Sequence, residues 1–257
     1  MAISIAIASG KGGVGKTTVA LNLGVALAQL GKNVTILDAN VEVASIGLYL
    51  GLNGSKPTLH SVLAGEAQIK DAIHEVSGAK VVTAGIRLES LRKIDLGKFR
   101  ECANSLLEDT DILLIDAPPG LGSSAITAIS AARAVLLVVT PDITSLSGAL
   151  KAKRIAEHFG ARILGAVINR ATKDKTELGI EEIEKVLMAE VIAEIPEDPE
   201  IRRAAAFGQP AVAMYPNSPA SQAFKKLAGD LDGIESIDGV EYALSKPLVI
   251  EGAYEEQ

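Results

Sequence analysis

The sequence has little of what disulfide-rich, metal–thiolate or membrane-spanning proteins need. Its 257 residues include one cysteine, Cys102, no tryptophan and only 3% aromatic residues. A single thiol cannot form an internal disulfide and offers no zinc or iron–sulfur spacing. No apolar run approaches the roughly 18 residues that a spanning helix requires, and no basic leader followed by an apolar segment is present. We therefore expect a cytoplasmic protein.

The sequence is rich in aliphatic residues and carries a net negative charge. Hydrophobic residues make up 48% of the chain, so with few aromatics the core must come from Ala, Val, Ile and Leu. That composition suits a buried parallel sheet covered by helices. The net charge of −7 argues against a surface that coats nucleic acid. The length allows one large α/β domain or two smaller ones, and no segment of the sequence marks a boundary between two domains.

A glycine-rich loop at residues 9–18, SGKGGVGKTT, lies between an expected strand and an expected helix. It fits the pattern G-x-x-x-x-G-K-[ST], in which backbone N–H groups and a helix N-terminus bind phosphate. Lys16 would reach the β- and γ-phosphates, and the Thr17 hydroxyl would bind Mg²⁺. A dinucleotide fingerprint fits less well, because threonines stand where a third glycine is needed. The residues expected to contact the nucleotide here are Gly10, Lys11, Gly12, Gly13, Val14, Gly15, Lys16, Thr17 and Thr18.

Two aspartates each follow an expected buried strand. Asp38 ends residues 33–38, and Asp116 ends residues 111–116, which are followed by the loop APPGLG. Carboxylates at the carboxyl ends of parallel strands point into the crevice where α/β sheets bind ligands. We expect Asp116 to hold Mg²⁺ directly or through water, and Gly120 to offer an N–H to the γ-phosphate.

Strands and helices are expected to alternate along residues 1–232. Right-handed crossovers then give one α/β domain with a mostly parallel sheet and helices on both faces. Residues 233–257 form an acidic C-terminal tail. The expected strands are 2–8, 33–37, 81–83, 111–116, 134–139, 163–168 and 191–195, and the expected helices are 17–30, 44–50, 59–63, 69–74, 99–107, 146–158, 180–188, 200–207 and 219–231.

Together these motifs resemble the MinD/ParA family of ATPases over residues 2–231, and most of all its archaeal MinD-like members. Lys11 stands where the family's deviant phosphate loop (deviant Walker A) carries its signature lysine. Asp38 resembles the first switch, and residues 116–121 resemble the second. The segments that resemble the adenine-binding parts of the family contain Asn169, Arg170, Pro196, Glu197 and Asp198.

The resemblance implies a single-domain P-loop NTPase that binds ATP and Mg²⁺ and forms a homodimer around ATP. Hydrolysis releases the pair, and this cycle positions or partitions a cellular component with the help of a protein activator or cargo. The signature lysine reaches the phosphates of the partner subunit, where it would act like an arginine finger. By resemblance, Lys11, Lys16, Asp38 and Asn40 have catalytic roles, and Thr17, Asp38 and Asp116 hold the metal.

Asn40 departs from the family pattern, which has a second aspartate two residues after the first. An amide can accept a hydrogen bond from water but cannot take a proton or add negative charge. Glu42 is close enough in sequence to substitute for that aspartate. The alternative function is therefore an ATP-binding dimeric scaffold with little or no hydrolysis. Ligases and synthetases on the same fold stay open, whereas iron–sulfur carriers need paired cysteines.

Two surface functions of relatives are not expected here. Bacterial MinD proteins bind membrane through a basic C-terminal helix, but residues 233–257 hold only one base, Lys246, among many acids. DNA binding, known in ParA-like relatives, is disfavoured by the negative net charge. The basic residues that could contribute to a DNA surface are Lys151, Lys153, Arg154, Arg202, Arg203, Lys225 and Lys226.

Overall fold

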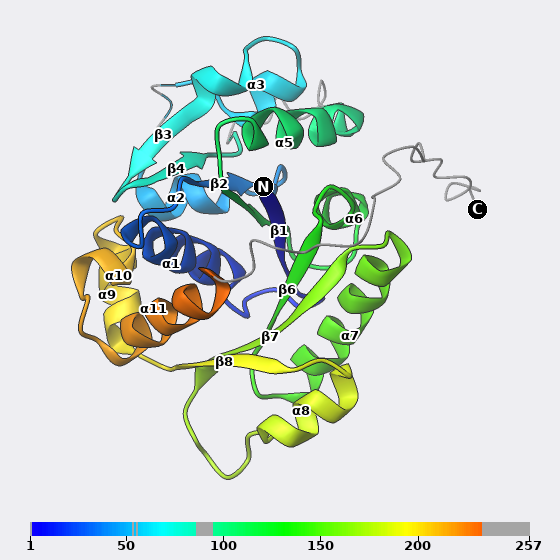
Figure 1. The fold of residues 1–257 in the computed structure, drawn as a ribbon, viewed down its shortest axis with the longest axis vertical. Helices are drawn as coiled ribbons and strands as arrows, with labels where there is room; N and C mark the ends of the chain where they lie inside the picture. The colour runs from blue at the N-terminus through cyan, green and yellow to red at the C-terminus, as the bar shows by residue number, and fades with distance from the viewer. Residues whose placement is uncertain (1, 53, 55, 86–94, 233–257) are drawn as a thin grey trace.

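The computed structural model describes residues 2–52, 54, 56–85 and 95–232. Within these residues eight strands form one sheet in the order β3-β4-β2-β5-β1-β6-β7-β8 (Figure 1). Every neighbouring pair in this part of the chain is parallel except β3 and β4. The strands are β1 (Ile3–Ala8), β2 (Val34–Asp38), β3 (Ile73–Val76), β4 (Ala79–Val82), β5 (Ile112–Asp116), β6 (Ala134–Val139), β7 (Arg162–Ala171) and β8 (Val191–Pro196).

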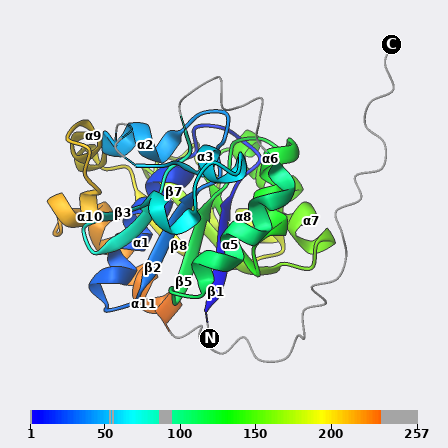
Figure 2. The same cartoon turned by 90° about the horizontal axis from the view of Figure 1, so that it is seen from above.

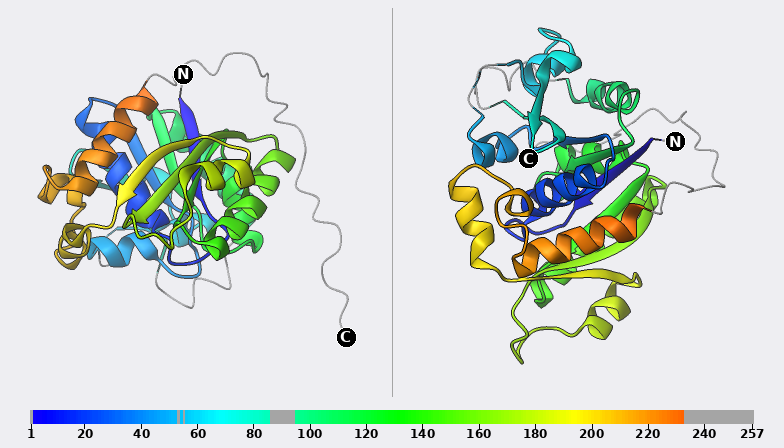
Figure 3. Two further views of the ribbon diagram at one scale, coloured as in Figure 1. Left: turned by 90° about the horizontal axis from the view of Figure 1, so that it is seen from below. Right: turned by 60° about the vertical axis from the view of Figure 1, so that its left-hand side comes forward.

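Helices cover both faces of the sheet. Helices α1, α2, α10 and α11 pack on one face, and α3, α5, α6, α7 and α8 pack on the other. Figure 3 shows α1 and α11 side by side on their face. The helices are α1 (Lys16–Gln29), α2 (Ser45–Leu50), α3 (Leu59–Leu63), α5 (Phe99–Leu107), α6 (Ser123–Ser130), α7 (Ile143–His158), α8 (Ile180–Leu187), α9 (Pro199–Ala206), α10 (Ala211–Met214) and α11 (Pro219–Asp232), with 3₁₀ turns at Ile69–Ala72 and Leu96–Lys98.

The central strands are apolar on both faces because each face has its own core. In β1, Ile5 and Ile7 belong to the core under α1 and α11, whereas Ala6 and Ala8 belong to the core under α5 and α7. Side chains alternate between the two faces of a strand, so a continuous aliphatic run is what a doubly covered sheet requires. The expected α/β fold with a mostly parallel sheet is confirmed.

The expected helix at 69–74 is wrong in its second half. Residues Ile69–Ala72 form a 3₁₀ turn, and β3 then runs antiparallel to β4. The two strands are joined by Ser77 and Gly78, with φ of 49° and 90°. Positive φ at both central residues is typical of the two-residue hairpin turn, which matches the twist of paired strands. The Ser77-Gly78 turn therefore favours a β-hairpin over the expected helix.

Other elements differ in their limits. Helix α7 begins at Ile143, three residues before the expected start, because the Asp142 carboxylate accepts a hydrogen bond from the Ser145 N–H at 2.9 Å and caps it. Strand β7 extends to Ala171, so the segment at 169–170 lies inside the strand. Helices α6 and α10 were not expected. The tail at 233–257 lies outside the described residues.

The fold brings the carboxyl ends of β1, β2 and β5 together at one edge of the sheet. In Figure 2, β1 runs from the N-terminus at the bottom of the view toward this edge. Asp38 and Asp116 are direct partners in the parallel register of β2 and β5, and Ile7 of β1 is the partner of Asp116 on the other side. Among the helices of the described residues, none has the length and apolar character needed to cross a bilayer.

Candidate functional site

The loop between β1 and α1 depends on glycines with a left-handed backbone. Gly13 and Gly15 have φ of 78° and 95°, which only glycine adopts readily, and Gly15 precedes the first turn of α1 without a side-chain cap. Lys16 is buried, and its Nζ donates to Ser9 Oγ at 3.1 Å. Burial lowers the pKa of Lys16, and the Asp116 carboxylate opposes this effect. Uncapped N–H groups at a helix N-terminus beside a buried cation form an anion site.

Two close contacts hold this loop in place. A Cβ at Gly10 would lie 2.2 Å from the carbonyl oxygen of Gly148 in α7, so the two backbones touch. On the other side Asn169 of β7 donates from Nδ2 to the Val14 carbonyl at 2.8 Å. A Cβ at Gly15 would lie 2.2 Å from the same amide nitrogen. The loop is therefore clamped between α7 and β7.

Thr17 and Asp116 meet beside the loop. Thr17 Oγ1 donates to Asp116 Oδ2 at 2.6 Å, and Asp116 Oδ1 is buried with no hydrogen-bond partner among the described residues. A hydroxyl and a carboxylate oxygen lacking a partner are hard ligands that suit Mg²⁺. The described residues hold no cluster of three or more His, Cys, Asp or Glu that could bind a metal alone. Phosphate and water oxygens would have to complete the shell.

Asp38 lies next to Asp116 but uses its oxygens differently. Its Oδ1 accepts the Asn40 N–H at 3.1 Å, and its Oδ2 accepts the Ile46 N–H at 2.9 Å. Burial raises the pKa of Asp38, and the charge of Asp116 raises it further; burial also raises the pKa of Asp116. Two buried carboxylates at one edge favour a bound cation. Asp38 also fixes the loop that follows it.

Asn40 is engaged within that same loop. Its Oδ1 accepts the Val43 N–H at 3.2 Å, and its Nδ2 donates to Ser45 Oγ at 2.9 Å. The amide thus bonds one backbone N–H and one side-chain hydroxyl, both within residues 40–45. Glu42 is exposed, and its Oε1 lies 3.4 Å from Ser124 Oγ at the start of α6. The loop after β2 is in this way connected to the helix that follows the 117–122 loop.

Lys11 contacts the first turn of α7. Its Nζ lies 3.1 Å from Asp142 Oδ1 and 2.7 Å from Thr144 Oγ1, with 42% of its side chain exposed. Burial opposes ionisation of Asp142, but hydrogen bonds from Thr140, Thr144, the Ser145 N–H and Lys11 hold its pKa well below the usual range. Sequence reasoning missed Asp142. The sequence held a signal only for its role as a helix cap: an aspartate three residues after the strand at 134–139 and three residues before a serine.

The segments expected to hold adenine lie at the ends of β7 and β8. Arg170 has a left-handed φ of 60°, and its exposed side chain lies 3.9 Å from Glu197. Pro196 ends β8 opposite Ala171 of β7. Asp198 caps α9 by accepting the Glu200 N–H at 2.9 Å and also accepts the backbone N–H of the second residue of α11 at 3.0 Å. The two segments are neighbours, as one binding wall requires.

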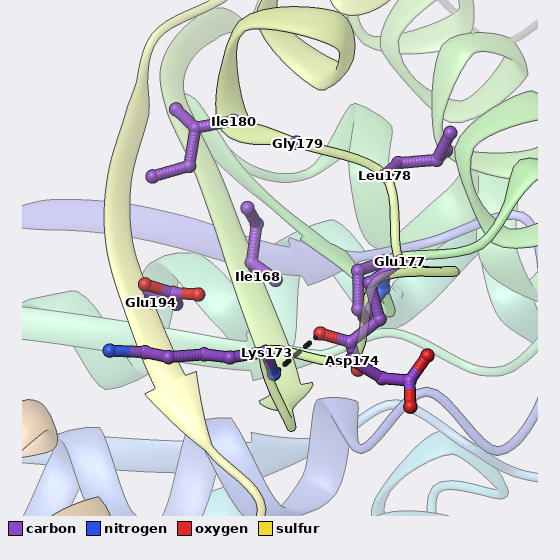
Figure 4. A pocket seen from close by; sticks show the side chains of 9 residues that line it. Ile168, Lys173, Asp174, Glu177, Leu178, Gly179, Ile180 and Glu194 are labelled. Carbon is purple, nitrogen blue, oxygen red and sulfur yellow. Dashed lines mark hydrogen bonds between the residues drawn. The ribbon is translucent and has the colours of Figure 1, made fainter.

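A separate hollow lies along β7, β8 and the loop that leads to α8 (Figure 4). Glu177 shapes this loop, because its carboxylate accepts the Lys173 N–H at 2.9 Å. The hollow contains none of the residues predicted for the nucleotide site. It is lined by Pro141, Ile168, Lys173, Asp174, Glu177, Leu178, Gly179, Ile180 and Glu194.

Some of the basic residues considered for DNA make local contacts. Lys153 is buried and donates to Glu157 Oε1 at 2.5 Å, and Arg154 Nη1 lies 3.7 Å from Oε2 of the same residue. Lys225 donates to a main-chain carbonyl at 2.9 Å. Lys153 therefore faces the protein and is removed from the set that could contact a duplex.

Comparison with known proteins gives consistent matches. A family profile described as "ParA: NUBPL iron-transfer P-loop NTPase" matches residues 1–232. An uncharacterized ATP-binding protein of Methanocaldococcus jannaschii is 49% identical over 234 residues, which cover 91% of this chain and 89% of that protein. The cell division ATPase MinD of Pyrococcus furiosus aligns with a TM-score of 0.87 and 38% identity over 90% of this chain and 99% of that one. Septum site-determining protein MinD of Pyrococcus horikoshii, complexed with Mg-ADP, aligns with a TM-score of 0.86 and 37% identity over 92% and 100%.

These matches cover the sheet, both helix layers and the glycine-rich loop, so the likeness is not confined to one motif. The order of elements in the structure agrees with these matches, because β1 leads through the glycine-rich loop into α1. The chain belongs to the MinD/ParA family of P-loop NTPases.

Proposed function

We propose that this protein is an ATP-binding, Mg²⁺-dependent ATPase switch that forms a dimer around ATP and thereby positions or partitions a cellular component. The observation that carries the proposal is the Thr17–Asp116 pair, with a buried carboxylate oxygen that lacks a partner, beside an uncapped helix N-terminus. The relative from Pyrococcus horikoshii is complexed with Mg-ADP, which supports the same ligand class here.

The residues of the loop divide the binding task between them. Backbone N–H groups of residues 12–16 and the ammonium of Lys16 would bind the phosphates. Thr17 and Asp116 would hold Mg²⁺, which neutralises phosphate charge when bound. Asp38 is a further candidate near the metal, since it lies beside Asp116 in the sheet. Asn169 and its neighbours at the ends of β7 and β8 would contact the base.

Lys11 is proposed to couple ATP binding to dimer formation. In the single chain its ammonium rests on Asp142 and Thr144, a partly exposed ion pair of the kind that contributes about 0–1 kcal/mol. Leaving this contact therefore costs little. Family resemblance implies that the lysine then reaches the phosphates bound by the partner subunit, where it would stabilise charge on the transferred group.

A dimeric scaffold with little hydrolysis is the second candidate. It rests on one observation, that the oxygen and the nitrogen of the Asn40 amide each form a hydrogen bond inside their own loop. The amide oxygen could still accept a bond from a water, but it could not take a proton. Glu42 lies in the same loop and could supply a carboxylate instead.

The cellular role is proposed from relatives. The Pyrococcus furiosus protein is a cell division ATPase, and we propose a related positioning role that requires a protein activator or cargo. Iron transfer, which appears in the description of the family profile, is less well supported. Cys102 is the single cysteine of the chain, it is buried in α5, and burial raises the pKa of its thiol.

Light scattering with and without Mg²⁺–ATP, run beside a phosphate-release assay, tests the proposal. We expect a monomer without ATP, a dimer with it, and measurable turnover. Lys11→Ala should abolish the ATP-dependent dimer, whereas Lys151→Ala, an exposed lysine in α7, should not change it. A molecular mass that is the same with and without ATP would contradict the switch. A stable dimer without turnover would favour the scaffold.

A further inference from the structure

His60 is a buried histidine that the proposed mechanism does not use. It lies in the short helix α3 with only 1% of its surface exposed. Its Nε2 lies 2.7 Å from the Val41 carbonyl oxygen. A carbonyl only accepts hydrogen bonds, so Nε2 must carry the proton. The imidazole therefore donates to the loop that joins β2 to α2.

The other ring nitrogen of His60 lacks a partner. Nδ1 is buried without a hydrogen bond in the described part of the chain. Burial lowers the pKa of His60, while the bond to Val41 opposes this effect, in agreement with a neutral ring. An unpaired buried acceptor destabilises a fold, and an apolar side chain would avoid that cost. The bond to Val41 is thus the feature that an apolar residue could not replace.

Gly85, just beyond β4, provides the space for this ring. A Cβ on Gly85 would lie 2.5 Å from His60 Nδ1 and 2.8 Å from Thr58 Oγ1. Helix α3 is itself fixed to the sheet, because the Leu59 N–H donates to the Thr83 carbonyl at 2.9 Å. The imidazole has little freedom to move away from Val41, and it serves as a rigid support.

Val41 occupies the middle of the loop that carries the candidate hydrolytic residues. Asn40 precedes it and Glu42 follows it, and the Val41 side chain is buried in the same core as α3. The loop is otherwise fixed through Asp38 and the Asn40 amide. His60 is the contact that holds this loop from the side of α3.

We propose that His60 is a positioning residue for the loop at 39–45, holding the Val41 carbonyl and thereby fixing the positions of the flanking Asn40 and Glu42. This inference rests on the proposed ATPase function. His60 touches no residue of the phosphate loop in any hydrogen bond of the described residues. Its loss should therefore affect turnover and leave ATP affinity nearly unchanged.

Two polar substitutions separate this role from general packing. In His60→Gln the amide nitrogen can occupy the place of Nε2 and donate to Val41. In His60→Asn the shorter amide reaches only the place of Nδ1, so the bond to Val41 is lost while polarity is kept. Gly85→Ala offers an independent route, since its methyl group would displace the ring. His74→Gln, in β3, is the control histidine.

Hydrogen–deuterium exchange on the nucleotide-free protein is the first measurement. We expect exchange in peptides covering 39–46 to rise about tenfold in His60→Asn and Gly85→Ala, and to stay near wild type in His60→Gln and His74→Gln. Peptides from β1, α1 and β5 should not change. Unaltered exchange at 39–46 in His60→Asn would overturn the proposal. A rise of equal size in every peptide of His60→Asn and Gly85→Ala would also overturn it, because the role would then be packing.

Steady-state hydrolysis is the second measurement. We expect kcat to fall about fivefold in His60→Asn, the size that one hydrogen bond gives, with ATP Kd within about twofold of wild type. His60→Gln should recover most of the rate. A His60→Asn variant with wild-type kcat would refute the positioning role. Wild-type protein that binds ATP without turnover would instead refute the ATPase proposal, and the exchange result would then decide the role of His60 alone.

Discussion

The clamp between β7 and the phosphate loop predicts how the loop responds to substitution at Asn169. Its Nδ2 donates to the Val14 carbonyl at 2.8 Å, and both residues are almost fully buried. Asn169→Ala leaves that carbonyl unpaired, which should cost about 1–3 kcal/mol of stability. Asn169→Asp keeps the shape but puts a carboxylate against a carbonyl, so its loss should exceed that of the alanine variant.

A double-mutant cycle with Gly15→Ala makes the test quantitative. The new Cβ would lie 2.2 Å from the Asn169 amide, and the backbone there has a φ of 95°. The left-handed conformation costs about 1–2 kcal/mol in any background. The clash disappears once Asn169 is Ala. The loss of unfolding free energy in the double variant should therefore be smaller, by at least about 1 kcal/mol, than the sum of the losses in the two single variants.

Equilibrium urea unfolding of the four nucleotide-free proteins measures this coupling. The single Gly15→Ala variant should also bind ATP more weakly than wild type, because the turn that presents the N–H groups is altered. Losses that add within about 0.5 kcal/mol would refute the reasoning, since independent sites behave in that way. An Asn169→Asp variant as stable as Asn169→Ala would refute the assignment of Nδ2 as the donor.

Three further predictions follow from other contacts. Gly148→Ala should lose about 1–3 kcal/mol in urea unfolding, because its Cβ would lie 2.9 Å from the backbone carbonyl carbon of Gly10, whereas Gly229→Ala in α11 has open space and should lose nothing. Asn40→Asp should raise kcat in a phosphate-release assay, and an unchanged rate would show that the amide does not limit hydrolysis. Burial opposes ionisation of Asp198, but backbone hydrogen bonds outweigh it and lower its pKa. The ionised Asp198 carboxylate should stabilise the fold fully at pH values above its ordinary pKa of 3.8, and this stabilisation should be lost as the pH falls below that value. Urea unfolding of Asp198→Asn at several pH values should lack this pH dependence.

Local patterns predicted most of the fold. The strand at 134–139 and the helices at 59–63 and 99–107 have the expected limits. The strand is a short continuous apolar run between polar residues, whereas the apolar residues of the helix at 99–107 recur at helical spacing. The strand expected at 81–83 corresponds to β4, but its hairpin partner β3 was missed, since a single Ser-Gly turn outweighed a helix-like spacing. Helix α10 is only four residues long, too short for any period to show.

The candidate site, like the fold, was predicted from the sequence only in part. The glycine loop and the aspartates at the ends of β2 and β5 could be found because each is a short motif beside a strand. Asp142, Gly148 and His60 could not, because their importance depends on which distant elements become neighbours. Nothing within a few residues of Gly148 indicates that its backbone meets Gly10. Such contacts arise from topology and are visible only after folding.

The backbone contact between Gly10 and Gly148 also has a mechanical consequence. With no side chains between them, the backbones of the phosphate loop and α7 lie directly against each other at residues 10 and 148, so nothing flexible separates the two elements. The helix continues for ten residues to His158, about 15 Å at 1.5 Å per residue. A shift of the phosphate loop toward α7 would therefore be passed directly to this helix and not be absorbed by an intervening side chain.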